Sequence, residues 1–395
     1  MSKSGHKTRT IPLSKPWLDE AEVQASRRPI VSAWVTQGPE VAAFEQEFAS
    51  LVGTPYACAV SNCTSALHLA LLAVGVKPGD EVSTVSHSFI ASANSIRYCG
   101  ATPVFVDIQP GTFNMDPEIM DQTITDRTRA ILCVHQMGMP CDLKAILQIA
   151  ERHSLPVVED AACAIGSEIL GEGNWEKIGK PHGDIACFSF HPRKLITTGD
   201  GGMLTTSHEQ WDEKFRHWRQ HGMSVSDAVR HGSNKVIFES YPALGYNYRL
   251  TDIQAAVGRE QLKKVPDLVK RRRYLADRYR ELLGDIPGLL LPEEPSWARS
   301  NWQSYCVRLP EGCVQREVMQ YLLDLGISTR RGIMCAHREE AYADIPLPLP
   351  LPESERAQEQ CIILPLFHEF TEEDQDHTAT ALREALRPNK HGPAS

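Results

Sequence analysis

Short apolar runs alternate with helix-like segments between residues 56 and 206. The runs are candidate strands, at residues 57–60, 81–85, 103–106, 130–134, 156–158 and 185–188. Between them, segments such as 65–74, 91–98 and 143–153 repeat apolar residues at helical spacing. This alternation predicts βα units, and the runs, which are nearly continuously apolar, predict a mainly parallel sheet that is buried on both faces.

The pattern changes after Thr251. Residues 252–283 predict one or two long helices, whose many basic side chains we assign to a solvated face. A proline-rich connector at 287–295 precedes a strand at 304–309 and helices at 315–325 and 379–386, which predict a smaller α+β unit. The prolines between 346 and 352 predict an extended loop, and the tail after Pro388 is predicted to be disordered.

A chain of 395 residues is longer than one hydrophobic core usually serves. We therefore expect an N-terminal arm over residues 1–30, a large domain over 31–255, and a small C-terminal domain over 256–390 that begins with the long linking helix.

Composition excludes several classes of protein. The formal net charge of −9 argues against nucleic-acid binding, which needs a basic surface. We find no apolar run long enough for a membrane span and no apolar segment typical of a signal peptide near Met1. The 11 cysteines include no C-x-x-C pair, so we expect buried free thiols in a reducing cytoplasm and no metal site.

Three segments carry candidate chemistry. The turn from Ser61 to Leu67 follows a strand and opens a helix, where free N–H groups and the hydroxyls of Thr64 and Ser65 favour phosphate, although simple N-capping explains the same residues. Asp160 ends a predicted strand, where α/β sheets bind ligands, and its carboxylate is suited to a protonated ring nitrogen; a helix N-cap is an equal alternative.

The third segment runs from Ser189 to Lys194 and precedes a glycine-rich turn at 199–202. Taken singly, Lys194 is best explained as a surface lysine. A phosphate-binding turn, a strand-end aspartate and a loop lysine, in that order, are however the groups that a pyridoxal phosphate (PLP) enzyme needs.

With these three segments in this order, the chain resembles a known family, the DegT/DnrJ/EryC1/StrS sugar aminotransferases, which are fold-type I PLP enzymes. The resemblance covers about residues 11–386 and rests on ordered motifs: Trp34 with Gly38 and Phe44-Glu45, the Cys63–Leu67 turn, Gly79-Asp80-Glu81-Val82, Ser88-Phe89, Glu159-Asp160-Ala161-Ala162, Ser189-Phe190 with Lys194, Gly199–Gly202, and Gly245-Tyr246-Asn247-Tyr248-Arg249. It implies a large domain with a mainly parallel seven-stranded sheet between helices, and a smaller α+β C-terminal domain.

The resemblance also implies roles for individual residues. Lys194 forms the Schiff base with PLP, and Asp160 pairs with the pyridine nitrogen. Phe89 stacks on the ring, and Asn247 reaches the phosphate of the neighbouring subunit's cofactor, which implies a homodimer with shared active sites. The phosphate is bound by Thr64, Ser65 and Ser189.

Some positions depart from the family pattern. Cys163 stands where Gln or His is common, Cys63 replaces a glycine before the phosphate-binding turn, and Asp200 replaces a glutamate. The aromatic residue and proline that usually precede His337 are missing. We expect substrate contacts at Arg249, Arg331 and His337; Arg330 or Arg331 suits a nucleotide diphosphate or a carboxylate, or is simply surface charge.

The expected reaction moves an amino group, by resemblance from L-glutamate, to a keto sugar nucleotide, with Lys194 as general base. Two alternatives lie within the family: an aminocyclitol (keto-inositol) aminotransferase, and a PLP-dependent sugar dehydratase. The dehydratase branch carries histidine in place of the lysine, although His191 is close by. A non-catalytic sensor is a third alternative, disfavoured because we find no DNA-binding segment.

Overall fold

The computed structural model describes residues 10–225, 230 and 233–387, and the tail predicted to be disordered lies outside this range. Its main sheet has seven strands in the order β1-β9-β8-β5-β4-β2-β3. They are β1 (Tyr56–Val60), β2 (Glu81–Val85), β3 (Thr102–Val106), β4 (Thr128–Val134), β5 (Val157–Asp160), β8 (Ile185–Ser189) and β9 (Gly202–Thr206). Neighbouring strands are parallel except where β9 pairs with β1 and β8. The predicted mainly parallel sheet is confirmed.

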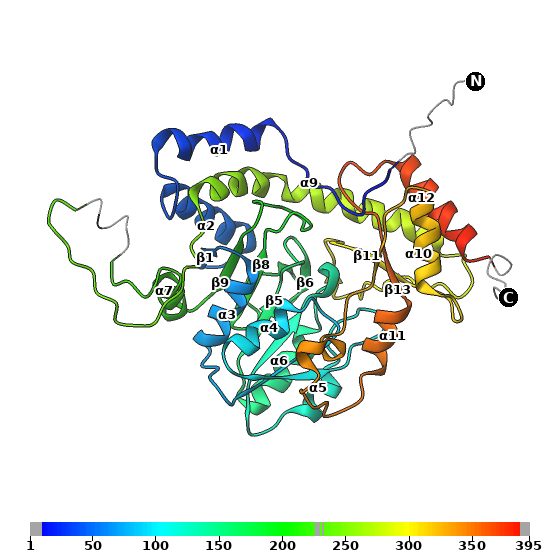
Figure 1. The fold of residues 1–395 in the computed structure, drawn as a ribbon, viewed down its shortest axis with the longest axis horizontal. Coiled ribbons are helices and arrows are strands. Elements are labelled where there is room, and N and C mark those ends of the chain that lie inside the picture. The colour runs from blue at the N-terminus through cyan, green and yellow to red at the C-terminus, as the bar shows by residue number, and fades with distance from the viewer. Residues whose placement is uncertain (1–9, 226–229, 231–232, 388–395) are drawn as a thin grey trace.

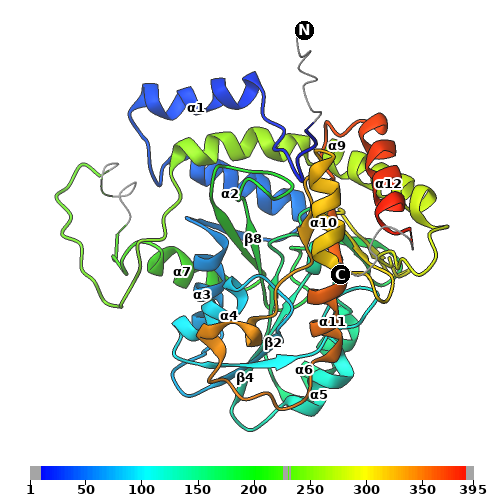
Figure 2. The same ribbon diagram turned by 45° about the vertical axis from the view of Figure 1, so that its right-hand side comes forward.

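The main sheet is buried on both faces. Alternate residues of β4 show this, because Ile131 and Cys133 enter one apolar core while Ala130 and Leu132 enter another. On one face lie α3 (Cys63–Ala73), α4 (Ala91–Tyr98) and α7 (Glu209–Trp218). On the other lie α2 (Pro39–Val52), α5 (Pro117–Thr123) and α6 (Leu143–His153), and Figure 2 shows α3 and α6 on opposite sides of the strands.

The long segment after Thr251 forms a single helix, α9 (Asp252–Leu283). Thr251 caps its N-terminus through a reciprocal pair of hydrogen bonds with Gln254. The first half of α9 packs into the core of the main sheet, whereas Leu275 and Tyr279 from its second half enter a separate core. Figure 1 shows α9 running beside α1 (Glu20–Ser32) and on towards α12 (Glu372–Ala385). The division into an arm and two domains stays a prediction.

Two small antiparallel sheets complete the fold. One orders β11 (Tyr305–Arg308), β13 (Cys361–Leu364) and β12 (Arg330–Arg331), and the other orders β10 (Ala298–Arg299), β6 (Glu168–Leu170) and β7 (Trp175–Lys177). Beside the first lie α10 (Gln315–Asp324) and α11 (Pro352–Gln360). Pro352, predicted as part of a loop, is instead the first residue of α11, a position where proline is favoured.

The topology brings four chain segments to one edge of the main sheet. Strands β1, β2, β5 and β8 run in the same direction, so their carboxyl ends meet there. The segments that follow them are Ser61–Thr64, Ser86–Phe89, Ala161–Cys163 and Phe190–Lys194. Among the described helices, none combines the length and apolarity that crossing a bilayer would require.

Candidate active site

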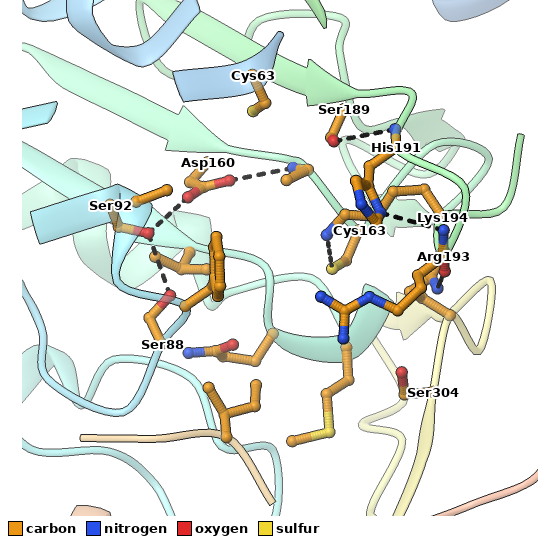
Figure 3. A pocket seen from close by; sticks show the side chains of 18 of the residues that line it. Cys63, Ser88, Ser92, Asp160, Cys163, Ser189, His191, Arg193, Lys194 and Ser304 are labelled. Atoms are coloured by element: carbon orange, nitrogen blue, oxygen red, sulfur yellow. Dashed lines mark hydrogen bonds between the residues drawn. The ribbon is translucent and has the colours of Figure 1, made fainter. Parts of the chain in front are cut away.

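A cavity of about 710 Å³ opens at this edge of the sheet. Its wall includes every residue predicted to contact the cofactor of its own subunit: Thr64, Ser65, Phe89, Asp160, Ser189 and Lys194. Arg331 also lines it, whereas Asn247, Arg249 and His337 do not. Figure 3 shows Asp160 and Lys194 approaching the cavity from different segments.

Two adjacent acids end β5, and they point in opposite directions because side chains alternate along a strand. Asp160, 5% exposed, faces the cavity, where its Oδ2 accepts a hydrogen bond from Ser92 Oγ at 2.7 Å. Its Oδ1 accepts from the backbone N–H of Ala162 at 3.1 Å. Glu159 is fully buried, 3.0 Å from His135 Nε2. Burial would raise the pKa of Glu159, but hydrogen bonding to His135 holds it below its usual range.

The turn before α3 is available to an anion. Asn62, not Thr64 or Ser65, caps the helix, with its Oδ1 accepting from the N–H of Ser65 at 2.8 Å. Within the described part of the chain, the N–H groups of Cys63 and Thr64 have no hydrogen-bond partner. Gly202 of β9 lies directly behind the turn, because a Cβ there would be 2.5 Å from the carbonyl carbon of Asn62.

Lys194 is partly buried in the cavity wall. Its backbone N–H donates to the carbonyl of His191 at 2.8 Å, which fixes the turn after β8. Its Nζ lies 3.0 Å from Cys163 Sγ, so the cysteine that departs from the family pattern contacts the amine directly (Figure 3). Burial alone would lower the pKa of Lys194, but Cys163 and Asp160 raise it above its ordinary value.

Of the predicted substrate residues, Arg331 lines the cavity, whereas Arg249 and His337 do not. His337 has both ring nitrogens engaged, Nδ1 with Ser86 Oγ at 2.6 Å and Nε2 with Glu355 Oε1 at 3.2 Å. Arg331 lies on β12 with its side chain half exposed, 3.9 Å from Glu339. The nearest carboxylate is thus at the limit of an ion pair, and most of the charge of Arg331 is available to a ligand.

The donor groups of the cavity fit PLP. Free N–H groups and hydroxyls suit its phosphate, a buried carboxylate suits its ring nitrogen, and a lysine amine suits its aldehyde. Sequence reasoning missed Asn62 as the cap and Ser92 as the partner of Asp160. The spacing of Ser88 and Ser92, four residues apart at the start of a predicted helix, was the signal that could have pointed to Ser92.

Comparisons with known proteins agree with this geometry. A family model described as "DegT/DnrJ/EryC1/StrS aminotransferase family" matches residues 16–383. The spore coat polysaccharide biosynthesis protein SpsC of Bacillus subtilis is 36% identical, with 95% of this chain and 97% of SpsC covered. The structure of DesI in the presence of its TDP-sugar product is 30% identical at a TM-score of 0.85, covering 96% of this chain and 93% of DesI.

A third similar protein has been solved in its PLP form. It is Spr1654 of Streptococcus pneumoniae, which is 28% identical at a TM-score of 0.87, with 95% of this chain and 98% of Spr1654 covered.

Proposed function

Because the chain belongs to the DegT/DnrJ/EryC1/StrS aminotransferase family, we propose that it transfers the amino group of L-glutamate to a keto sugar nucleotide and so makes an amino sugar. One observation carries the proposal: the amine of Lys194 and the carboxylate of Asp160 face the same cavity as the anion-binding turn at Thr64. The enzyme is a PLP-dependent aminotransferase, and the bound cofactor supplies the electron sink that makes an amino acid's Cα–H bond acidic.

Each predicted cofactor contact keeps a defined role in this proposal. Lys194 Nζ binds the aldehyde carbon, and Asp160 holds a proton on the ring nitrogen. Phe89, which is 58% exposed, would cover the face of the cofactor's pyridine ring. The phosphate is bound by the hydroxyls of Thr64, Ser65 and Ser189.

Lys194 also moves the proton of the reaction. With PLP bound, Lys194 Nζ would act as the base that removes the proton from the donor's Cα, and as the acid that gives a proton to the acceptor carbon that gains the amine. The contact with Cys163 Sγ holds the free amine inside the cavity between these steps.

The basic side chains of the cavity support anionic substrates. Arg193, Arg330 and Arg331 line it, while its acidic lining residues are Asp160, which serves the cofactor, and Asp200. Arginine binds carboxylates and phosphates through paired N–H groups, which suits both glutamate and a nucleotide diphosphate. DesI, which has been solved with a TDP-sugar product, supports the second of these substrates.

We propose that the protein is a homodimer in which residues of both chains contribute to each active site. The segment that leads to Asn247 exposes large apolar side chains, with Phe238 91% exposed and Leu244 82% exposed. Exposed apolar clusters mark contacts between proteins. A neighbouring chain that covers this segment brings Asn247 to the phosphate of the partner's cofactor, which accounts for its position outside the cavity of its own chain.

The test uses purified holoenzyme with ¹⁵N-labelled glutamate and a panel of keto sugar nucleotides, with a keto-inositol as a separate arm. Mass spectrometry should detect the label in an amino sugar nucleotide, and K194A should give no labelled product. Label in the inositol arm alone would identify an aminocyclitol aminotransferase. Loss of water without label transfer would identify a dehydratase.

A further inference from the structure

Two buried serines join Asp160 in a hydrogen-bonded series. Ser92 lies in the first turn of α4 and donates to Asp160 Oδ2 at 2.7 Å, and Ser88 Oγ lies 3.1 Å from Ser92 Oγ (Figure 3). Ser88 is 4% exposed and Ser92 is 1% exposed, so bulk water does not compete for these contacts. Neither serine has a role in the function proposed above.

The direction of the series follows from the chemistry of its end group. An ionised carboxylate only accepts hydrogen bonds, so Ser92 must give its single hydroxyl proton to Asp160. Ser92 then has only lone pairs to offer to Ser88, and Ser88 must donate to Ser92. Donation therefore runs from Ser88 through Ser92 to the carboxylate.

The carboxylate needs this support because of where it lies. Asp160 is 5% exposed, so water solvates its carboxylate poorly and its hydrogen bonds must come from protein donors. The two donors to Asp160 contact different oxygens, since Ser92 binds Oδ2 and the N–H of Ala162 binds Oδ1. Together they fix the plane of the carboxylate, and each oxygen keeps a further lone pair for the ring nitrogen.

We propose that Ser92 is a positioning residue that orients the Asp160 carboxylate by donating to its Oδ2, so that the shared proton stays on the cofactor's ring nitrogen. Ser88 strengthens the donation by Ser92. The inference rests on the proposed contact between Asp160 and that nitrogen. Without Ser92, the carboxylate binds the proton more readily and the ring nitrogen loses it.

The direct test is the ¹⁵N NMR resonance of PLP that is labelled at its ring nitrogen and bound to the holoenzyme. The wild type should show a protonated nitrogen, and S92A should shift the resonance towards the unprotonated position. S92T retains the hydroxyl and should restore the wild-type resonance. S88A, which removes only the outer donor, should give a smaller shift in the same direction.

The chain offers a matched control in Ser95, which is on the same helix and fully buried. Its hydroxyl donates to the backbone carbonyl of Ser92 at 2.8 Å and has no contact with Asp160. S95A should leave the resonance unchanged. The rate of the glutamate half-reaction should fall about tenfold in S92A, which corresponds to a hydrogen bond to a charged group, and should stay near wild type in S95A and S92T.

The outcomes separate this inference from the proposed function. If the wild-type ring nitrogen is protonated and S92A shows the same resonance, Ser92 has no such role while the role of Asp160 stands. If the wild-type nitrogen is itself unprotonated, the proposed role of Asp160 is wrong and this inference is wrong with it. If S92A does not fold, S92C, with its weaker donor, should show the shift instead, and a wild-type resonance in S92C would overturn the inference.

Discussion

Substituting Glu45 with glutamine should destabilise the fold, because the carboxylate of Glu45 forms ion pairs with two arginine side chains. Glu45 lies on α2, is 5% exposed, and accepts from the backbone N–H of Ala59 at 2.9 Å. Arg216 Nη1 contacts one carboxylate oxygen at 2.6 Å, and Arg219 Nη1 contacts the other. Burial raises the pKa of Glu45, but the two guanidinium groups hold it below its usual range.

The expected loss follows from the burial of each partner. Removing one member of a buried ion pair costs about 3–5 kcal/mol, since the remaining charge is left uncompensated. The side chain of Arg219 is 6% exposed, but that of Arg216 is 38% exposed and keeps Asp212 as a second partner at 2.6 Å. We therefore expect E45Q to lose about 3 kcal/mol, at the lower end of this range.

Urea unfolding measures this loss, and Glu47 on the same helix provides the control. The side chain of Glu47 is 38% exposed and pairs with Arg259 near the surface. E47Q should therefore cost about 0–1 kcal/mol. If E45Q loses no more stability than E47Q, the reasoning from burial is wrong.

Three further predictions follow from the same structure. G202A should weaken PLP binding, measured by reconstitution of the apoenzyme, because its Cβ would displace the turn that we propose binds the phosphate; unchanged affinity would contradict the predicted clash. H337A should also weaken PLP binding and raise the KM for glutamate little. His337 contacts Ser86, at the start of the segment that carries Phe89, the proposed ring-stacking residue; the reverse pattern would make His337 a substrate contact. Lowering the pH through and below the ordinary glutamate pKa of about 4.3 should reduce the free energy of unfolding, because Glu45 and Glu159 have lowered pKa values when folded and contribute stability only while ionised. In urea titrations, E45Q should lose less stability than the wild type on acidification. Equal losses in the two proteins would refute this.

Much of the fold could be predicted because its signals are local. The continuous apolar run Ala130–Val134 that gave β4 is dictated by burial on both faces of the sheet. The predicted helices at 91–98 and 143–153 match α4 and α6 to the residue. The short strands β6, β7 and β10 were not predicted, because two or three residues carry no periodicity, and β10 pairs with β6, which is distant in sequence.

The candidate site shows the same limit. Motif order predicted that Lys194, Asp160 and Thr64 would meet, and the structure places all three on one cavity. Local sequence could not decide which residue caps α3, because Asn62, Thr64 and Ser65 all favour that position. The turn also packs against Gly202 of β9, a tertiary contact that local sequence does not show.

The contact between Cys163 and the amine of Lys194 is a second such case. The sequence shows an unusual residue at position 163, but the two side chains are separated by 31 positions and by strand β8. Only the folded chain shows that Cys163, the residue that departs from the family pattern, contacts the amine of Lys194.

The central claim is that Lys194 carries the cofactor, and the most direct test is to reduce the holoenzyme with borohydride and locate the trapped group by peptide mass spectrometry. The account predicts a phosphopyridoxyl group on Lys194 and loss of the visible absorbance, with neither change in K194A. A label on another lysine, or an unmodified Lys194 in enzyme that has bound PLP, would contradict it.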